Sequence, residues 1–173
     1  MIITPPNGLV RVSAPASEPV TLAETKNYLR VTHSDDDARI VDMIATARML
    51  AEQWLRRSLI TQSWKLTCEE AISGSVRLPM GPVQSITSVT SISETNVSTV
   101  QPASATALSA NKMALVVDSI ITGFRIEIVY VAGYGTSGAV PGPIKYGMLG
   151  HIACLYDGSV GMAPIRSEER RVG

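Results

Sequence analysis

The sequence predicts an α+β protein: a small helical bundle with an inserted antiparallel β-sheet and extended N- and C-terminal arms. Two observations support this fold class. Apolar residues recur at helical spacing in three segments, and a long stretch rich in alternating and β-branched residues separates the second from the third. The helical segments are about 21–31, 34–57 and 142–157, and the β-rich stretch is 60–131.

Both ends of the chain have the composition of extended arms. Residues 1–19 hold four prolines, which remove backbone donors and favour extended structure. Residues 158–173 combine glycine, proline and charged side chains, with too little apolar area to fold alone. The 173 residues are enough for one domain with a proper core, here residues 20–157 between the arms.

Capping signals mark the start of the first two helices. Thr21 and Glu24 have the T-x-x-E spacing of a capping box. Ser34 is expected to cap the second helix, with the acidic residues 35–37 in its first turn complementing the helix dipole. The buried face of this second helix is expected to comprise Ile40, Ile44, Ala47, Ala51 and Trp54.

The β-rich stretch has a clear start and an irregular middle. Trp64, Leu66 and Cys68 alternate with polar residues, as in a half-buried strand. Apolar residues within 83–92 recur every three positions, which predicts either a β-bulge or a strand that twists between two surroundings. The small, polar residues 94–112 predict a turn and a surface excursion before a strand resumes at 113–117. Trp54 and Trp64 are interpreted as core anchors rather than base-stacking platforms, because aromatic residues are few.

The stretch from Arg125 to Tyr156 links the last strand to the last helix. Ile126, Ile128 and Tyr130 fall on one strand face, and the glycines that follow end the strand. Pro141 and Pro143 suit the first turn of a helix, where a missing N–H costs nothing. The apolar stripe of that helix is Ile144, Met148, Ile152 and Tyr156.

The glycines of this link, Gly133, Gly135 and Gly138, spell G-x-G-x-x-G, so a nucleotide-binding enzyme is one alternative. In a dinucleotide site the third glycine already lies inside a helix whose N-terminus faces the pyrophosphate. Here the two prolines place the helix start after the motif. We therefore interpret the glycines as a positive-φ turn and expect no cofactor.

No catalytic or metal-binding constellation emerges from the remaining polar residues. The three consecutive aspartates, 35–37, point in different directions on a helix and are better explained by capping than by metal binding. His151 and Cys154 could supply two zinc ligands, but no second pair accompanies them. Cys68 and Cys154 are expected to be reduced, buried, small apolar residues.

Charge and hydropathy restrict the partners. Fifteen basic residues balance fifteen acidic ones, which argues against a general nucleic-acid-binding surface. No apolar run approaches the roughly 20 residues that span a bilayer, so no membrane partner is expected. No secretory signal is recognised, which favours synthesis in a bacterial cytoplasm.

Several segments together resemble the head-tail connector, or adaptor, proteins of long-tailed double-stranded DNA phages and gene transfer agents. The resemblance runs from about Pro19 to Tyr156, and its segments keep the order and spacing of the family. After Tyr156 the chain departs from the family, because Asp157 and Gly158 replace a charged helical continuation. The segments are EPVTLAETKNYLRV, SDDDARI, RRSLITQSWKL, VRLPMGPVQSITSV and VYVAGYG followed by VPGPIK.

This resemblance implies a structural virion protein of the neck, not an enzyme. Copies of such a protein form a ring of about twelve beneath the portal, extend the DNA channel and present a platform for the next neck or tail component, the stopper. DNA is then only cargo. The alternative within virions is a stopper or tail-completion protein. We expect the C-terminal tail to order on the portal, through Ile165, Arg166, Arg170, Arg171 and Val172.

Overall fold

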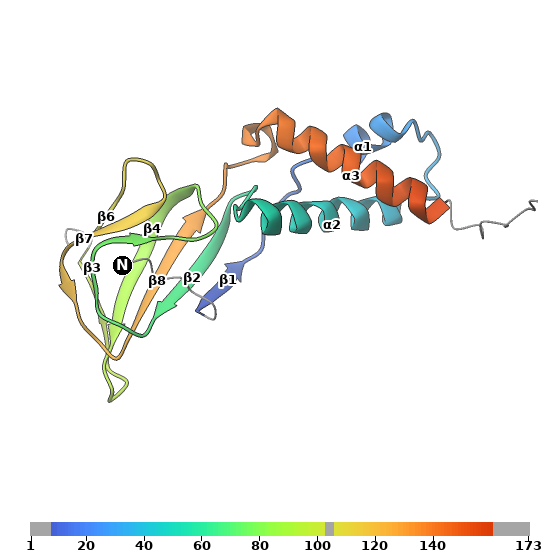
Figure 1. Ribbon diagram of the computed structural model, residues 1–173. Helices are drawn as coiled ribbons and strands as arrows, with labels where there is room; N and C mark the ends of the chain where they lie inside the picture. The colour runs from blue at the N-terminus through green and yellow to red at the C-terminus, as the bar shows by residue number, and fades with distance from the viewer. Residues whose placement is uncertain (1–7, 103–105, 161–173) are drawn as a thin grey trace, which may run out of the picture.

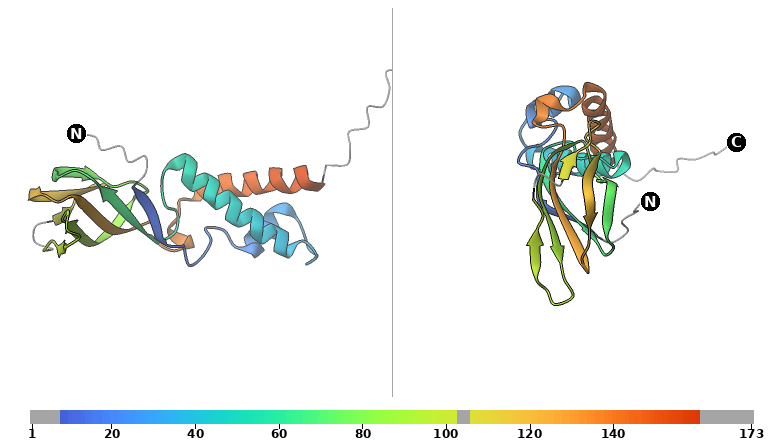
Figure 2. Two further views of the ribbon diagram at one scale, coloured as in Figure 1. Left: turned by 90° about the horizontal axis from the view of Figure 1, so that it is seen from below. Right: turned by 90° about the vertical axis from the view of Figure 1, so that its left-hand side faces the viewer.

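The computed structural model describes residues 8–102 and 106–160, which form two parts arranged along one long axis (Figures 1 and 2). The helices lie at one end and the β-sheets at the other. Each part has its own cluster of buried apolar side chains. The predicted α+β class, with helices and antiparallel sheet, is confirmed.

Helix α1 (Leu22–Leu29) begins with the predicted capping box. The Glu24 amide donates to Thr21 Oγ1 at 3.1 Å, and the Thr21 amide donates to Glu24 Oε2 at 2.7 Å. Arg30 closes the helix in the left-handed conformation, so its amide reaches back to the carbonyls of the last turn.

Helix α2 (Asp37–Leu55) starts later than predicted, and Ser34 does not cap it. The N-cap position belongs to Asp36, whose side chain makes no capping hydrogen bond. The acidic residues instead contact other elements: Asp37 pairs with Lys26 of α1 at 2.6 Å, and Asp36 accepts from Tyr156 of α3 at 2.7 Å. Tertiary partners therefore outweigh the local capping preference of Ser34.

Helix α3 (Gly142–Val160) packs against α2 and α1 through the predicted stripe. Met148 and Ile152 are buried, and Ile144 and Tyr156 pack against the same cluster. On α2 the matching face is Ile40, Ile44 and Ala47, with Ala51 partly buried. Trp54 was predicted on this face but is 86% exposed, because α2 ends within a turn and α3 does not cover it.

The β part consists of two antiparallel sheets that enclose the second core (Figure 1). One sheet has the order β1-β2-β8-β4-β5, and the other has the order β3-β7-β6. The strands are β1 (Leu9–Ser13), β2 (Gln62–Cys68), β3 (Ile72–Arg77), β4 (Val83–Ile92), β5 (Ser98–Val100), β6 (Thr106–Leu108), β7 (Ala114–Ile121) and β8 (Arg125–Ala132).

Strand β8 lies at the centre of the larger sheet, and its alternation is visible in its burial. Ile126, Ile128 and Tyr130 are fully buried, whereas the residues between them are only partly covered. Of the two alternatives for residues 83–92, the bulge agrees with the pairing, since the register of β4 against β8 shifts twice. These shifts account for the three-residue recurrence of apolar side chains in that strand.

Two segments have more regular structure than the sequence analysis predicted. The polar excursion 94–112 contains β5 and β6, which pair with β4 and β7. Within the N-terminal arm, residues 9–13 form β1, an edge strand paired with β2. Each of these short strands pairs with one neighbour only and contains no buried residue, so none of them has the alternation of buried apolar and exposed polar residues that identifies a strand in a sequence.

A buried polar network joins the helical part to the sheets. Arg48 of α2 contacts Glu18 at 2.7 Å and Glu52 at 3.1 Å. The carboxylate of Glu52 also accepts from the Leu59 amide at 2.9 Å and from Gln62 Nε2 at 2.7 Å. This one carboxylate thus holds the end of α2, the connection after it and the start of β2 in fixed positions.

Candidate interaction surfaces

The glycine turn lies where two connecting segments cross between the helical part and the sheets. Gly133 and Gly135 have φ of 131° and 128°, a region that L side chains rarely adopt. A Cβ on Gly133 would overlap the carbonyl oxygen of Ile60, so the two backbones approach too closely for any side chain. Gly138 has open space around it, and its position makes no such demand.

The first two backbone amides of this turn donate hydrogen bonds within the chain. The Gly133 amide donates to Pro82 O at 2.9 Å, and the Tyr134 amide donates to Leu59 O at 3.2 Å. Helix α3 begins only at Gly142, after a short 3-10 helix at Ser137–Ala139. A phosphate group at the turn would therefore not meet the helix N-terminus that a nucleotide site needs.

The acidic run serves to connect the three helices. Asp36 lies between His33, at 3.9 Å, and Arg39, at 3.8 Å, and also accepts from the Tyr156 hydroxyl. This hydrogen bond to a carboxylate raises the pKa of Tyr156, because the neutral phenol is the donor. Among the described residues, no three His, Cys, Asp or Glu side chains are grouped closely enough to hold a metal ion.

The two cysteines differ in burial, and both are free thiols. Cys68 lies in the core of the sheets, and burial raises its pKa. Cys154 was predicted to be buried, but it lies on the exposed side of α3 together with His151. The apolar stripe of α3 runs through Ile152 and Tyr156, and Cys154 points away from it.

An apolar groove runs between α2 and α3 next to the exposed indole of Trp54. We call it the α2/α3 groove; its volume is about 450 Å³, and His151 is the one titratable residue among those that line it. Ala47 and Met148 are its most buried lining residues, and Trp54, Leu55 and Pro143 are exposed at its edge. Sequence reasoning missed this groove because it assigned Trp54 to the core.

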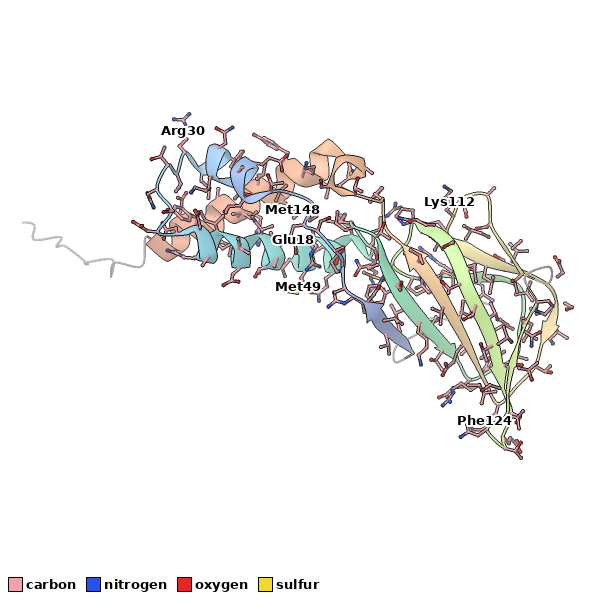
Figure 3. The ribbon with its side chains drawn as sticks, turned by 180° about the vertical axis from the view of Figure 1, so that it is seen from behind. Glu18, Arg30, Met49, Lys112, Phe124 and Met148 are labelled. Atoms are coloured by element: carbon pink, nitrogen blue, oxygen red, sulfur yellow. The ribbon has the colours of Figure 1, made fainter. Side chains whose placement is uncertain are left out.

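A second apolar surface lies at the opposite end of the molecule. Phe124 lies in the connection between β7 and β8, which passes from one sheet to the other, far from the helices (Figure 3). It is 63% exposed, and Ile120 and Val97 near it are similarly exposed. The protein thus presents apolar side chains at both ends of its long axis.

The predicted portal-binding residues, Ile165, Arg166, Arg170, Arg171 and Val172, lie outside the described residues. Helix α3, which leads into that segment, ends at the far end of the helical part (Figure 1). None of the helices in the described part of the chain is long and apolar enough to span a bilayer.

Solved structures of similar fold come from particle necks and virions. A chain from the neck of an empty gene transfer agent particle computed with C6 symmetry matches with a TM-score of 0.75 and 22% identity, over 86% of this chain and 83% of that chain. A chain from the virion of a native gene transfer agent particle matches with a TM-score of 0.73 and 20% identity, over 95% and 88%. A chain from the neck of a native particle computed with C12 symmetry matches with a TM-score of 0.71 and 22% identity, over 86% and 82%.

At these identities the structural likeness shows the fold, and the family is shown by sequence. No curated protein sequence is significantly similar to the chain. Residues 19–125 match the family model of the phage gp6-like head-tail connector proteins, which is more than half of the chain. The chain therefore belongs to the phage gp6-like head-tail connector family and is a structural protein of the virion neck.

Proposed function

We propose that this chain is the adaptor of the neck, which forms a ring of about twelve copies beneath the portal, extends the DNA channel and carries the next neck component. The family match over residues 19–125 is the observation that carries the proposal. Similar folds in necks computed with C6 and C12 symmetry support a ring, and the C12 symmetry agrees with about twelve copies.

The shape of the molecule suits an adaptor. Its helices and its sheets lie at opposite ends of one axis, so each end can meet a different partner (Figure 2). The balanced charge, fifteen basic and fifteen acidic residues, suits a channel wall that DNA passes without being retained. Enzymatic activity is not part of this role, and the glycine turn is explained by the crossing of two backbones.

The direction of α3 supports an orientation for the subunit in the neck. Because α3 ends at the outer end of the helical part, residues 161–173 start from that end. We assign portal docking to this tail, in which Arg166, Arg170 and Arg171 pair with portal carboxylates while Ile165 and Val172 fill shallow pockets. The sheets, with Phe124 at their tip, then face the next component.

Removing the tail tests the docking assignment. A chain lacking residues 164–173 should keep its fold, since the described cores end before this segment. It should lose association with purified portal rings in electron micrographs and should yield DNA-filled heads without tails. The full-length chain is the positive control.

Three other outcomes would change the proposal. Unchanged portal binding by the truncated chain would move the docking surface to the described part of the protein. A full-length chain that bound only to a preformed portal–adaptor complex would be a stopper. Saturable binding of NAD, FAD or ATP in calorimetry would reopen the enzyme alternative.

A further inference from the structure

Helix α2 exposes apolar side chains on the face that points away from α3. Ala38, Val41, Ala45 and Met49 recur at spacings of three and four residues and form what we call the outer stripe. Val41 is 47% exposed and Met49 is 50% exposed. Figure 3 shows Met49 and Met148 on opposite sides of α2.

Few charges accompany this stripe. After Asp37 the charged residues of α2 are Arg39, Asp42, Arg48 and Glu52, and the last two are buried in the network that reaches the sheets. A surface helix ordinarily carries charged and polar residues opposite its core face. An apolar outer face with so little charge is typical of a helix that another surface covers.

The α2/α3 groove supplies a surface of complementary shape. Its floor includes Ala47, Ala51 and Gly147, which leave space for a side chain from outside, and Trp54 forms a wall beside them. With 3.6 residues per turn, the groove side of α2 and the outer stripe lie about 180° apart around the helix. Helix α2 therefore has the outer stripe, which projects, on one side and contributes to the α2/α3 groove, which can receive side chains, on the opposite side.

Two different faces on opposite sides are what a closed ring requires. Each copy in a ring uses one surface toward the preceding copy and another toward the following copy, whereas a two-fold dimer uses the same surface twice. In a ring of about twelve, neighbours differ by a rotation of about 30°, so adjacent α2 helices stay close enough to parallel to pack side by side. Because the copies are related by rotation without translation, their α2 helices lie at the same position along the ring axis. This places Met49 of one copy near Ala51 of the next.

The positions of two charged residues on α2 agree with this side-by-side arrangement of neighbouring copies. Asp42 flanks the outer stripe and makes no ion pair within the described residues. Arg39 lies on the groove side of α2, with its guanidinium 5.5 Å from the Tyr156 ring and 3.8 Å from Asp36. Residues 39 and 42 are about one turn apart, so side-by-side packing brings the Asp42 carboxylate of one copy toward Arg39 of its neighbour.

We propose that α2 is the subunit contact of the ring, with the outer stripe of one copy packed into the α2/α3 groove of the next. This inference rests on the proposed ring function and names the surface that closes the ring. The occupant of the groove is thus a second copy of this chain. It requires no segment beyond the described residues.

Single substitutions on each face test the contact. Met49→Glu places a charge on the outer stripe, and Trp54→Glu places one at the groove; both side chains are at least half exposed, so the fold should tolerate them. Ile120→Glu, at a site on β7 that is 64% exposed, is the matched control. Equal thermal melting of the three variants and the unmodified chain establishes that each is folded.

Electron microscopy of portal rings mixed with each chain gives the first measurement. The unmodified chain and Ile120→Glu should form closed rings on the portal, whereas Met49→Glu and Trp54→Glu should leave incomplete ones. Closed rings with either α2 variant would overturn the contact, and so would a loss of closed rings with Ile120→Glu as large as that with the α2 variants. Neither result would contradict the adaptor function.

Sedimentation without portal gives an independent measurement. The unmodified chain is expected to be monomeric at micromolar concentration and to associate when concentrated, and each α2 variant alone should not. A mixture of the two variants should form pairs and nothing larger, because only one intact stripe and one intact groove remain. If both variants associate like the unmodified chain, the proposed contact is wrong. This result would stand even if the unmodified chain failed to bind portal, a separate outcome that would contradict the proposed function.

Discussion

Gly133 lies where its backbone crosses that of Ile60 at the junction of helices and sheets, so close that a Cβ would overlap the Ile60 carbonyl. The Thr61 amide donates to Gly135 O at 3.1 Å, which keeps the two segments in contact. A side chain at position 133 would force the two segments apart, and a residue other than glycine would be strained at this φ. The first glycine of the motif that resembles a nucleotide loop is thus required by this crossing.

We expect Gly133→Ala to lower the free energy of unfolding by about 1–3 kcal/mol, the range for a residue held in an unfavourable backbone region. Gly138→Ala is the control and should change it little, since nothing lies within 4 Å of a Cβ built there. Urea denaturation of both variants measures the difference. Equal stability of the two would contradict the close-approach explanation.

At the scale of the element, the capping box of α1 shows a local signal that tertiary structure leaves intact. Glu24 accepts from the Thr21 amide, and this hydrogen bond is the main reason that its pKa is lowered; Lys145 of α3, at 3.2 Å, adds to the effect. Because the folded pKa lies below the unfolded value, the contribution to stability is present above the unfolded pKa and is lost as the pH falls through the folded pKa.

Glu24→Gln should therefore destabilise the protein near neutral pH and matter progressively less in acid. The loss near neutral pH should be about 1 kcal/mol or less, as for other exposed caps and helix-end charges. Thermal unfolding of the variant and the unmodified chain between neutral pH and about pH 3 gives the test. A stability difference that stayed constant across this range would argue against the ionised carboxylate as its source.

Helix α2 shows the opposite case, in which neighbours override the local signal. Ser34 has the sequence features of a cap, yet the helix starts at Asp37 because Lys26 and Tyr156 bind the acidic residues before and within its first turn. These partners lie 11 and 120 positions away in the chain. Periodicity within a short window contains no information on contacts at such separations.

For the whole molecule, Glu52 is the residue on which the attachment of helices to sheets most depends. It is 4% exposed, and its carboxylate is held by Arg48, Gln62 and the Leu59 amide. Removing the Glu52 carboxylate leaves Arg48 with Glu18 alone and takes the acceptor away from the Leu59 amide and Gln62 Nε2. The relative positions of the two ends of an adaptor depend on this junction.

Glu52→Ala is expected to cost about 3–5 kcal/mol, the usual effect of breaking a buried ion pair from one side. Lys145→Gln, which removes the exposed pair with Glu24, is the comparison and should cost no more than about 1 kcal/mol. Chemical denaturation measures both variants. A similar decrease in the free energy of unfolding for both variants would show that the contribution of the Glu52 network does not depend on its burial.

The sequence by itself determined the α+β class, the three helical segments, the alternation of β2 and β8, the bulge in β4 and the family. Each of these depends on spacing within one element or on motifs in a fixed order. Only the tertiary structure decided that Trp54 and Cys154 are exposed, that β1, β5 and β6 join the sheets, and that α2 carries two apolar faces. The reason is physical: spacing shows that residues share a face, but what covers that face is set by elements distant in the chain and by neighbouring molecules.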